Sequence, residues 1–205
     1  PYKLYDINSA VPKRELTEAQ RIAAAANLEK ARAVLHCVDC GCYSLRLDDN
    51  GRCRGCRDHY RMKQESRRAS EMLSKLASAD DWLIVDTETT GLDDAAEVVQ
   101  IAVVGGDGRI LVDTLVKPLG DIPQEATAIH GLDAAAVSSA PTWADVYPQL
   151  SGLLNGRLVL AYNASFDARM ISQTCALYSL PVPTADWECV MELFAALAGM
   201  WSGYH

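Results

Sequence analysis

The stretch that decides the fold reads Ile-Val-Asp-Thr-Glu-Thr-Thr-Gly-Leu at residues 84–92. The apolar residues at its start predict a short strand from Trp82 to Val85. Residues two apart on an extended chain point to the same face, so Asp86 and Glu88 lie together where this strand ends. Two neighbouring carboxylates repel each other unless cations lie between them, and Mg²⁺ and Mn²⁺ prefer such oxygen ligands. Taken alone, an acidic pair that ends a strand is more often ordinary surface or turn chemistry.

The chain after this stretch alternates between apolar strands and helices with one apolar face. The predicted elements are strands at 97–104, 110–116 and 158–161 and helices at 142–154 and 166–178. A Gly-Asp-Gly turn at 106–108 joins the first two of these strands as a hairpin, and Pro148 is a possible kink inside the first helix. A strand meander followed by helix, strand and helix predicts an α/β fold: a mixed sheet with helices against its faces.

A third carboxylate lies where the last predicted strand passes into a helix. Residues 158–167 read Leu-Val-Leu-Ala-Tyr-Asn-Ala-Ser-Phe-Asp and end on Asp167. On its own, Asp167 is a typical acid of a helix's first turn, where the helix dipole stabilises a negative charge.

Composition and charge narrow the class of protein. Of the 205 residues, 49% are hydrophobic and 22% charged, values that argue against disorder and allow a substantial core. The chain has no apolar run of the roughly 18–20 residues that cross a membrane, and its first residues lack the apolar core of a secretory signal. Residues 1–80 carry 15 Lys and Arg against 11 Asp and Glu, a net charge of +4, and residues 81–205 carry 4 against 16, a net charge of −12. These sum to −8 and indicate two segments with different partners.

Five of the seven cysteines lie in one stretch of twenty residues, 37–56, inside the basic segment 1–80. Two Cys-x-x-Cys pairs, Cys37 with Cys40 and Cys53 with Cys56, are separated by twelve residues, a spacing typical of a four-thiolate zinc site. Cys42 and His36 are close enough to replace one of the four and rank below them. The alternative is that these are ordinary reduced cysteines.

Two helices are predicted on either side of the cysteines. A capping pattern at Thr17 and Gln20 opens an alanine-rich helix to about Leu35, and a second helix runs from Asp58 to about Ser78. The basic residues in and near the second helix suit contacts with phosphates, although a solvated helix face is the alternative. They are Arg46, Arg52, Arg54, Arg57, Arg61, Lys63, Arg67 and Arg68.

Three strings resemble the motifs of the DEDD exonucleases of the DnaQ-like superfamily, which includes the proofreading epsilon subunits. They are Val-Asp-Thr-Glu-Thr-Thr-Gly-Leu (85–92), Ala-Ile-His-Gly-Leu (128–132) and Tyr-Asn-Ala-Ser-Phe-Asp (162–167), and the resemblance covers residues 81 to about 200. It implies a ribonuclease H-like fold and two Mg²⁺ or Mn²⁺ ions. It also implies that Asp86, Glu88 and Asp167 are the catalytic metal ligands. The positions that match the family's grip on the terminal nucleotides are Thr89, Leu92, His130, Asn163 and Phe166.

The sequence departs from this family in three ways. The cysteine-rich arm is outside the family core, and Tyr162 stands where the proofreading subunits usually carry His. The family's last motif, His-x-x-x-x-Asp or Tyr-x-x-x-Asp, is absent, and His205, a candidate for its first residue, follows Asp167 by only 38 positions. We therefore expect a chain that is incomplete at its C-terminus, lacks the fourth carboxylate and general base, and is weakly active or inactive as it stands.

The sequence thus predicts a helical arm at residues 1–80, with a zinc-binding module at 37–56 that holds one structural Zn²⁺, and an exonuclease domain at 81–205. The leading hypothesis is a cytoplasmic 3′–5′ exonuclease that acts on DNA or RNA 3′ ends and does not associate with a membrane. A polymerase or another replication or repair protein is a candidate partner. The alternative is a non-catalytic module with a nuclease-like fold that binds nucleic acid or protein, and the intact Asp86, Glu88 and Asp167 argue against it.

Overall fold

The computed structural model describes residues 17–18, 35–44 and 46–199. The chain divides into two compact units, Pro1–Arg61 and Met62–His205, and the division falls inside helix α2 (Arg54–Ser78). Helix α2 thus begins four residues before the start that the sequence predicts and ends at the predicted residue.

In the first unit, two short strands bracket a tight turn. Strand β1 (Leu35–His36) pairs antiparallel with β2 (Tyr43–Ser44). The helix expected from Thr17 to about Leu35 lies outside the described residues except at its ends, and Leu35 belongs to β1.

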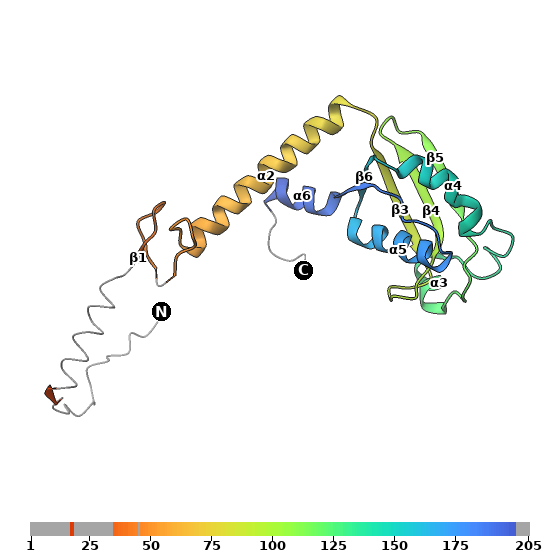
Figure 1. The fold of residues 1–205 in the computed structure, drawn as a ribbon, viewed down its shortest axis with the longest axis horizontal. Coiled ribbons are helices and arrows are strands. Elements are labelled where there is room, and N and C mark those ends of the chain that lie inside the picture. Colours follow the sequence, from red (N-terminus) through yellow and green to blue (C-terminus); the bar gives the residue numbers. More distant parts are fainter. Residues whose placement is uncertain (1–16, 19–34, 45, 200–205) are drawn as a thin grey trace. The chain divides into compact units, whose positions relative to one another are not determined.

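The second unit contains a five-stranded mixed sheet (Figure 1). In spatial order its strands are β5 (Ile110–Leu115), β4 (Val98–Gly105), β3 (Leu83–Thr89), β6 (Leu158–Ala161) and β7 (Asp186–Cys189). The first three pair antiparallel, whereas β6 pairs parallel with both β3 and β7. The helices of this unit after α2 are α3 (Gln124–His130), α4 (Trp143–Leu154), α5 (Ala164–Leu177) and α6 (Val190–Ala198). The mixed α/β sheet with flanking helices that the sequence predicts is confirmed.

The central strand β3 has two chemically different faces. Leu83, Val85, Thr87 and Thr89 are buried, whereas Asp86 between them is exposed and Glu88 is only partly buried. The buried face packs into a single core with side chains of α4 and α5, which include Trp143, Leu150, Leu154, Met170 and Ile171. The core therefore fixes which face of β3 carries its two acids, because a shift of one residue would exchange the faces.

Local signals explain the elements that match the sequence. The β4–β5 hairpin turns at residues 106–108, where the Gly106 N–H donates to the Trp82 carbonyl over 2.9 Å and Gly108 has φ +80°. Helix α4 opens with a capping box between Thr142 and Asp145, and it continues through Pro148.

Three elements of the second unit were not predicted from the sequence, and neither were β1 and β2 of the first unit. Helix α3 has only seven residues and starts after Pro123 without a side-chain cap, so it offers little helical periodicity. Strand β7 reads Asp-Trp-Glu-Cys and lies at the edge of the sheet, where its side chains are exposed or partly buried. Helix α6 did carry a signal: Gly199 follows it in the left-handed conformation, with φ +67°, as a typical helix stop.

The second half of α2 contacts the edge of this unit. Ala69 is buried against Leu193 and Ala196 of α6, and the Arg68 guanidinium pairs with the Glu188 carboxylate of β7. Within the described residues, no helix is long and apolar enough to cross a membrane.

Leu154 tests where the core lies. Its side chain is fully buried between α4 and the sheet, so Leu154→Ala should lower the free energy of unfolding by about 2–5 kcal/mol. The matched substitution Leu177→Ala, on a side chain that is 49% exposed, should cost less than about 1 kcal/mol. Urea unfolding measures both, and equal costs would contradict the placement of the core.

Candidate active site and cysteine cluster

Asp86 and Glu88 lie on the solvent-facing side of β3. In the pairing with β4, Asp86 lies opposite Ala102 and Glu88 opposite Gln100, so no cation on the neighbouring strand neutralises them. The pairing shifts register between Glu88 and Thr89, and regular strand structure ends there. The two acids thus project from the end of the central strand with their charges uncompensated by β4.

Asp167 reaches β3 from the first turn of α5. Its carboxylate is buried, with 5% of the residue exposed, and it accepts a 2.8 Å hydrogen bond from the Thr87 hydroxyl. Thr87 lies between Asp86 and Glu88 in the sequence and points to the other face of the strand. Thr87 of β3 therefore holds Asp167, and its two neighbours in the strand, Asp86 and Glu88, are the other two acids.

The pKa of Asp167 reports how these groups interact. Burial raises the pKa of Asp167 above its ordinary value, the hydrogen bond from Thr87 lowers it, and the negative charge of Asp86 raises it. Asp86 is therefore close enough to Asp167 to oppose its ionisation. In the described part of the chain, only cysteines form a group of possible metal ligands within 4.8 Å of one another. The oxygens of Asp86, Glu88 and Asp167 therefore lie farther apart than this in the structure.

His130 joins α3 to the end of β3. The Leu132 N–H donates to Nδ1 of His130 over 3.0 Å, so Nδ1 is the accepting nitrogen. The other nitrogen, Nε2, then carries the proton and donates to the Thr89 carbonyl over 3.2 Å. His130 thereby supports the Thr89 backbone, and both of its ring nitrogens are occupied within the protein.

The remaining residues of the predicted nucleotide grip lie at the ends of β3 and β6. Leu92 is 75% exposed, and Phe166 is partly buried at the start of α5. Asn163 is exposed, and its side-chain oxygen accepts a 3.1 Å hydrogen bond from the Ser165 hydroxyl. Tyr162, which precedes it, is 66% exposed.

Sequence reasoning missed two residues that shape this region. Thr87 appears in the sequence only as a spacer between two acids. Glu97 was assigned to a strand, yet it is a buried carboxylate that accepts hydrogen bonds from the N–H groups of Leu119 and Gly120, at 2.8 and 2.7 Å. The Glu97 backbone also bonds to Thr90 in both directions, so Glu97 anchors the loop after β3. A charged residue at the start of an apolar strand was the available signal.

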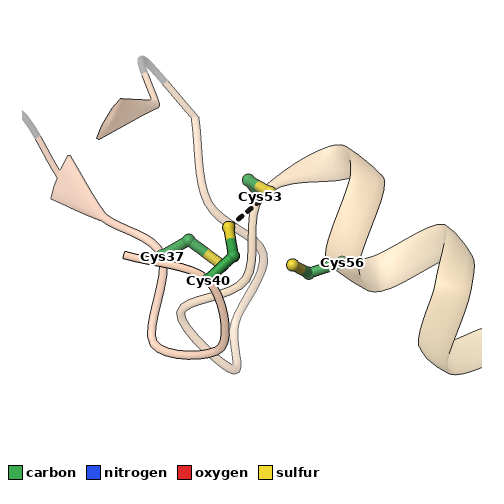
Figure 2. A group of neighbouring side chains, drawn as sticks. All are labelled: Cys37, Cys40, Cys53 and Cys56. Atoms are coloured by element: carbon green, nitrogen blue, oxygen red, sulfur yellow. Dashed lines mark hydrogen bonds between the residues drawn. The ribbon is translucent and has the colours of Figure 1, made fainter. Parts of the chain in front are cut away.

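The four cysteines of the two pairs converge in the first unit. Figure 2 shows Cys37 and Cys40 on one turn facing Cys53 and Cys56 at the start of α2. All four sulfur atoms lie within 4.8 Å of one another, and those of Cys40 and Cys53 are 3.9 Å apart. The turn closes through the Cys37 N–H to the Cys42 carbonyl and through Gly41, which has φ +68°.

The thiols of this cluster affect one another's ionisation. Hydrogen bonds from the backbone at Cys53 and Cys40 lower the pKa of Cys37 to about 6. Hydrogen bonding to Cys40 and Cys53 raises the pKa of Cys42 to about 12, and neighbouring thiols also raise the pKa of Cys56. Cys42 thus lies beside the cluster but, like His36, outside the group of four. A set of adjoining soft thiolates fits Zn²⁺.

The basic residues near the cysteines are largely paired with acids. Arg52 bonds to Asp39 over 2.9 Å, Arg54 and Arg57 approach Asp58, and Arg67 bonds to Glu71 over 2.8 Å. Of the predicted set, only Arg46, Arg61 and Lys63 make no ion pair within the described residues. The charge available for phosphates is therefore smaller than the sequence count indicates.

Residues 83–202 match the profile of the family described as Exonuclease (RNase_T). The chain belongs to this family. An uncharacterized exonuclease CP81 of Escherichia phage 186 is 45% identical over 126 residues, which cover 58% of this chain and 65% of that protein. Exodeoxyribonuclease 10 of Escherichia coli K12 is 35% identical over 123 residues, covering 58% of this chain and 48% of its own length. The chain thus spans less than two thirds of these relatives.

Solved structures agree on the fold. The nuclease domain of 3′hExo, titled a DEDDh family member bound to rAMP, superposes with a TM-score of 0.51 at 16% identity, over 60% of this chain and 72% of that one. The resemblance to DEDD exonucleases and the ribonuclease H-like fold predicted from the sequence are confirmed. Members of this family act with divalent metal ions.

Asp167 gives a test of the site without nucleic acid. Its raised pKa means that the ionised carboxylate destabilises the folded protein at pH 7. Asp167→Asn removes the charge and keeps an oxygen that accepts from Thr87, so without added Mg²⁺ or Mn²⁺ it should raise the melting temperature. The gain should shrink as the pH falls through the raised pKa of Asp167, because the wild-type carboxylate then becomes neutral.

Melting curves between pH 7 and 4 measure this gain. Asp81→Asn, at an exposed position, is the control and should leave the melting temperature nearly unchanged. An Asp167→Asn variant that melts below the wild type at pH 7 would contradict the electrostatic account.

Proposed function

We propose that this chain is a 3′–5′ exonuclease that hydrolyses nucleic acid from its 3′ end with two divalent ions, held in part by Asp86, Glu88 and Asp167. The observation that carries the proposal is the hydrogen bond between the buried Asp167 of α5 and Thr87. Thr87 lies between Asp86 and Glu88, the two acids of β3. An electrostatic cost of this kind is typical of functional sites. Family membership gives the reaction class.

The donor set fits Mg²⁺ or Mn²⁺. Three carboxylates offer hard oxygen ligands, and the repulsion between Asp86 and Asp167 falls when cations bind. Two bound ions would activate the attacking water and stabilise the departing 3′ oxygen. Asp86 and Glu88 hold their position because β3 is pinned by the core, and Asp167 because Thr87 fixes its carboxylate. A fourth carboxylate and a general base complete the chemistry, and His205 lies outside the described residues.

The terminal nucleotides would meet the residues around the end of β3. We assign the grip to Thr89, Leu92, His130, Asn163 and Phe166. Leu92 and Phe166 offer apolar surface for a base, and His130 keeps the Thr89 backbone in place. The name of the Escherichia coli relative favours DNA as the substrate. Two other relatives are named as DNA polymerase III proteins, which makes a polymerase a candidate partner.

We further propose that Cys37, Cys40, Cys53 and Cys56 bind one structural Zn²⁺. Four protein ligands would close the site, as in structural rather than catalytic zinc sites. The pKa of Cys37, near 6, already favours its thiolate at neutral pH, and a bound cation would draw the protons from the other thiols. The zinc would fix the turn after β1 to the start of α2. We assign residues 1–80 to an arm that recruits nucleic acid or a partner, and residues 81–205 to the nuclease domain.

The catalytic proposal is tested by Asp86→Ala. In the full-length protein this change should reduce the release of mononucleotides from a 3′-labelled strand by about 100-fold or more, because the remaining acids cannot position both the water and the leaving oxygen. Asp81→Ala, at an exposed acid outside the site, is the matched control and should digest at the wild-type rate. Digestion by the Asp86→Ala variant at that rate would refute the mechanism. Binding without digestion by the full-length wild type would favour a non-catalytic module.

The zinc proposal is tested by metal analysis. Protein purified without chelators should contain about one Zn per chain. Cys53→Ser should lose most of it, whereas Cys42→Ser should keep it, since Cys42 lies outside the group of four. Equal zinc contents in the two variants would overturn the ligand assignment.

A further inference from the structure

The loop between β3 and β4 carries Leu92 and is held by hydrogen bonds from side chains of helix α5. Both terminal nitrogens of the Arg169 guanidinium donate to the Leu92 carbonyl, at 3.2 and 3.3 Å. One turn later, the Gln173 side-chain amide donates to the carbonyls of Asp93 and Ala96, at 3.1 and 3.3 Å. The exposed loop thus has three of its backbone carbonyls bound by two side chains of α5.

Arg169 also contacts the second apolar residue of the predicted grip. Its guanidinium carbon lies 5.6 Å from the centre of the Phe166 ring, within the range of a cation–π contact. The same guanidinium donates to the Gln173 side-chain oxygen over 3.1 Å and reaches only 4.0 Å from the fully exposed Asp94 carboxylate. One side chain therefore joins the backbone of Leu92 to the ring of Phe166.

We propose that Arg169 is a positioning residue for the 3′-terminal nucleotide, acting by holding Leu92 at a fixed place relative to Phe166. This inference rests on the proposed nuclease function and deepens it. The Leu92 side chain is 75% exposed, so its position depends mainly on its backbone. The planar fork of an arginine can place two donors on one carbonyl, which a lysine ammonium does not reproduce.

A different role for Arg169 would be a direct contact with a substrate phosphate. Its side chain is 41% exposed, and its charge is only weakly compensated by Asp94. The bonds to the Leu92 carbonyl favour the positioning role, because both terminal nitrogens already donate to this carbonyl in the protein without nucleic acid. The two roles differ in how Arg169 couples to the Leu92 side chain.

The first experiment measures amide hydrogen exchange without nucleic acid. Arg169→Met should speed exchange in residues 91–97 by roughly tenfold, because bonds such as that of the Ala96 N–H to the Asp93 carbonyl then open more often. Arg157→Met is the matched control, since Arg157 is exposed and its side chain makes no bond within the described residues. Unchanged exchange in this loop would overturn the proposal even if the chain proved to have no nuclease activity.

The second experiment is a double-mutant cycle on digestion of a single-stranded oligonucleotide by the full-length protein. Arg169→Met should raise KM roughly five- to tenfold with little change in kcat, as expected when binding common to ground and transition states is lost. In a Leu92→Ala background the same change should raise KM less than about twofold, because both substitutions remove one effect. Arg169→Lys should not restore the wild-type KM.

Two results of this cycle would overturn the proposal. A phosphate contact predicts that Arg169→Lys behaves like the wild type and that the Arg169→Met effect persists in full beside Leu92→Ala. A fall in kcat alone would place Arg169 in the chemical step instead. If the full-length wild type digests nothing, the proposed function fails, and the exchange experiment still decides whether Arg169 holds the loop.

Discussion

The hydrogen bond from Thr87 to Asp167 is the interaction on which the site depends. Burying a carboxylate costs free energy, and here a single neutral hydroxyl and the start of a helix offset part of that cost. Because Thr87 lies on the buried face of β3, the bond exists only when the strand keeps its register. That register also places Asp86 and Glu88 on the opposite face. One contact thus couples core packing to the arrangement of three acids.

Hydrogen bonds to backbone groups hold the end of β3 and the residues that follow it. His130 donates to the Thr89 carbonyl, the Glu97 backbone bonds to Thr90 in both directions, and Arg169 donates to the Leu92 carbonyl. Side chains of α3 and α5 and the backbone just before β4 therefore fix the short stretch at and after the end of β3. These bonds hold exposed side chains such as Leu92 and Asp86 in fixed positions. Packing elsewhere in the fold supplies the stability that such exposed groups do not.

The sequence predicts most of the sheet because its strands have strong local signals. Strand β6 matches at both ends, and the turn at 106–108 follows from its glycines. Strand β3 runs to Thr89, beyond the apolar run that ended the prediction at Val85, because alternation continues through polar residues whose inner members are threonines. The roles of Thr87, Glu97 and Arg169 could not be read from the chain, since each depends on a partner 22 to 80 residues away. The cysteine spacing, by contrast, already favours the four sulfurs that lie within 4.8 Å of one another.

The central claim is that Asp86, Glu88 and Asp167 share one divalent-metal centre. Anomalous diffraction from crystals of the protein soaked in Mn²⁺ with a nucleoside 5′-monophosphate tests it most directly, because the signal locates the metal itself. The account predicts Mn²⁺ peaks bound by carboxylate oxygens of these three residues, with the nucleotide beside Leu92 and Phe166. Manganese bound elsewhere, or a peak that Asp167 does not contact, would contradict it.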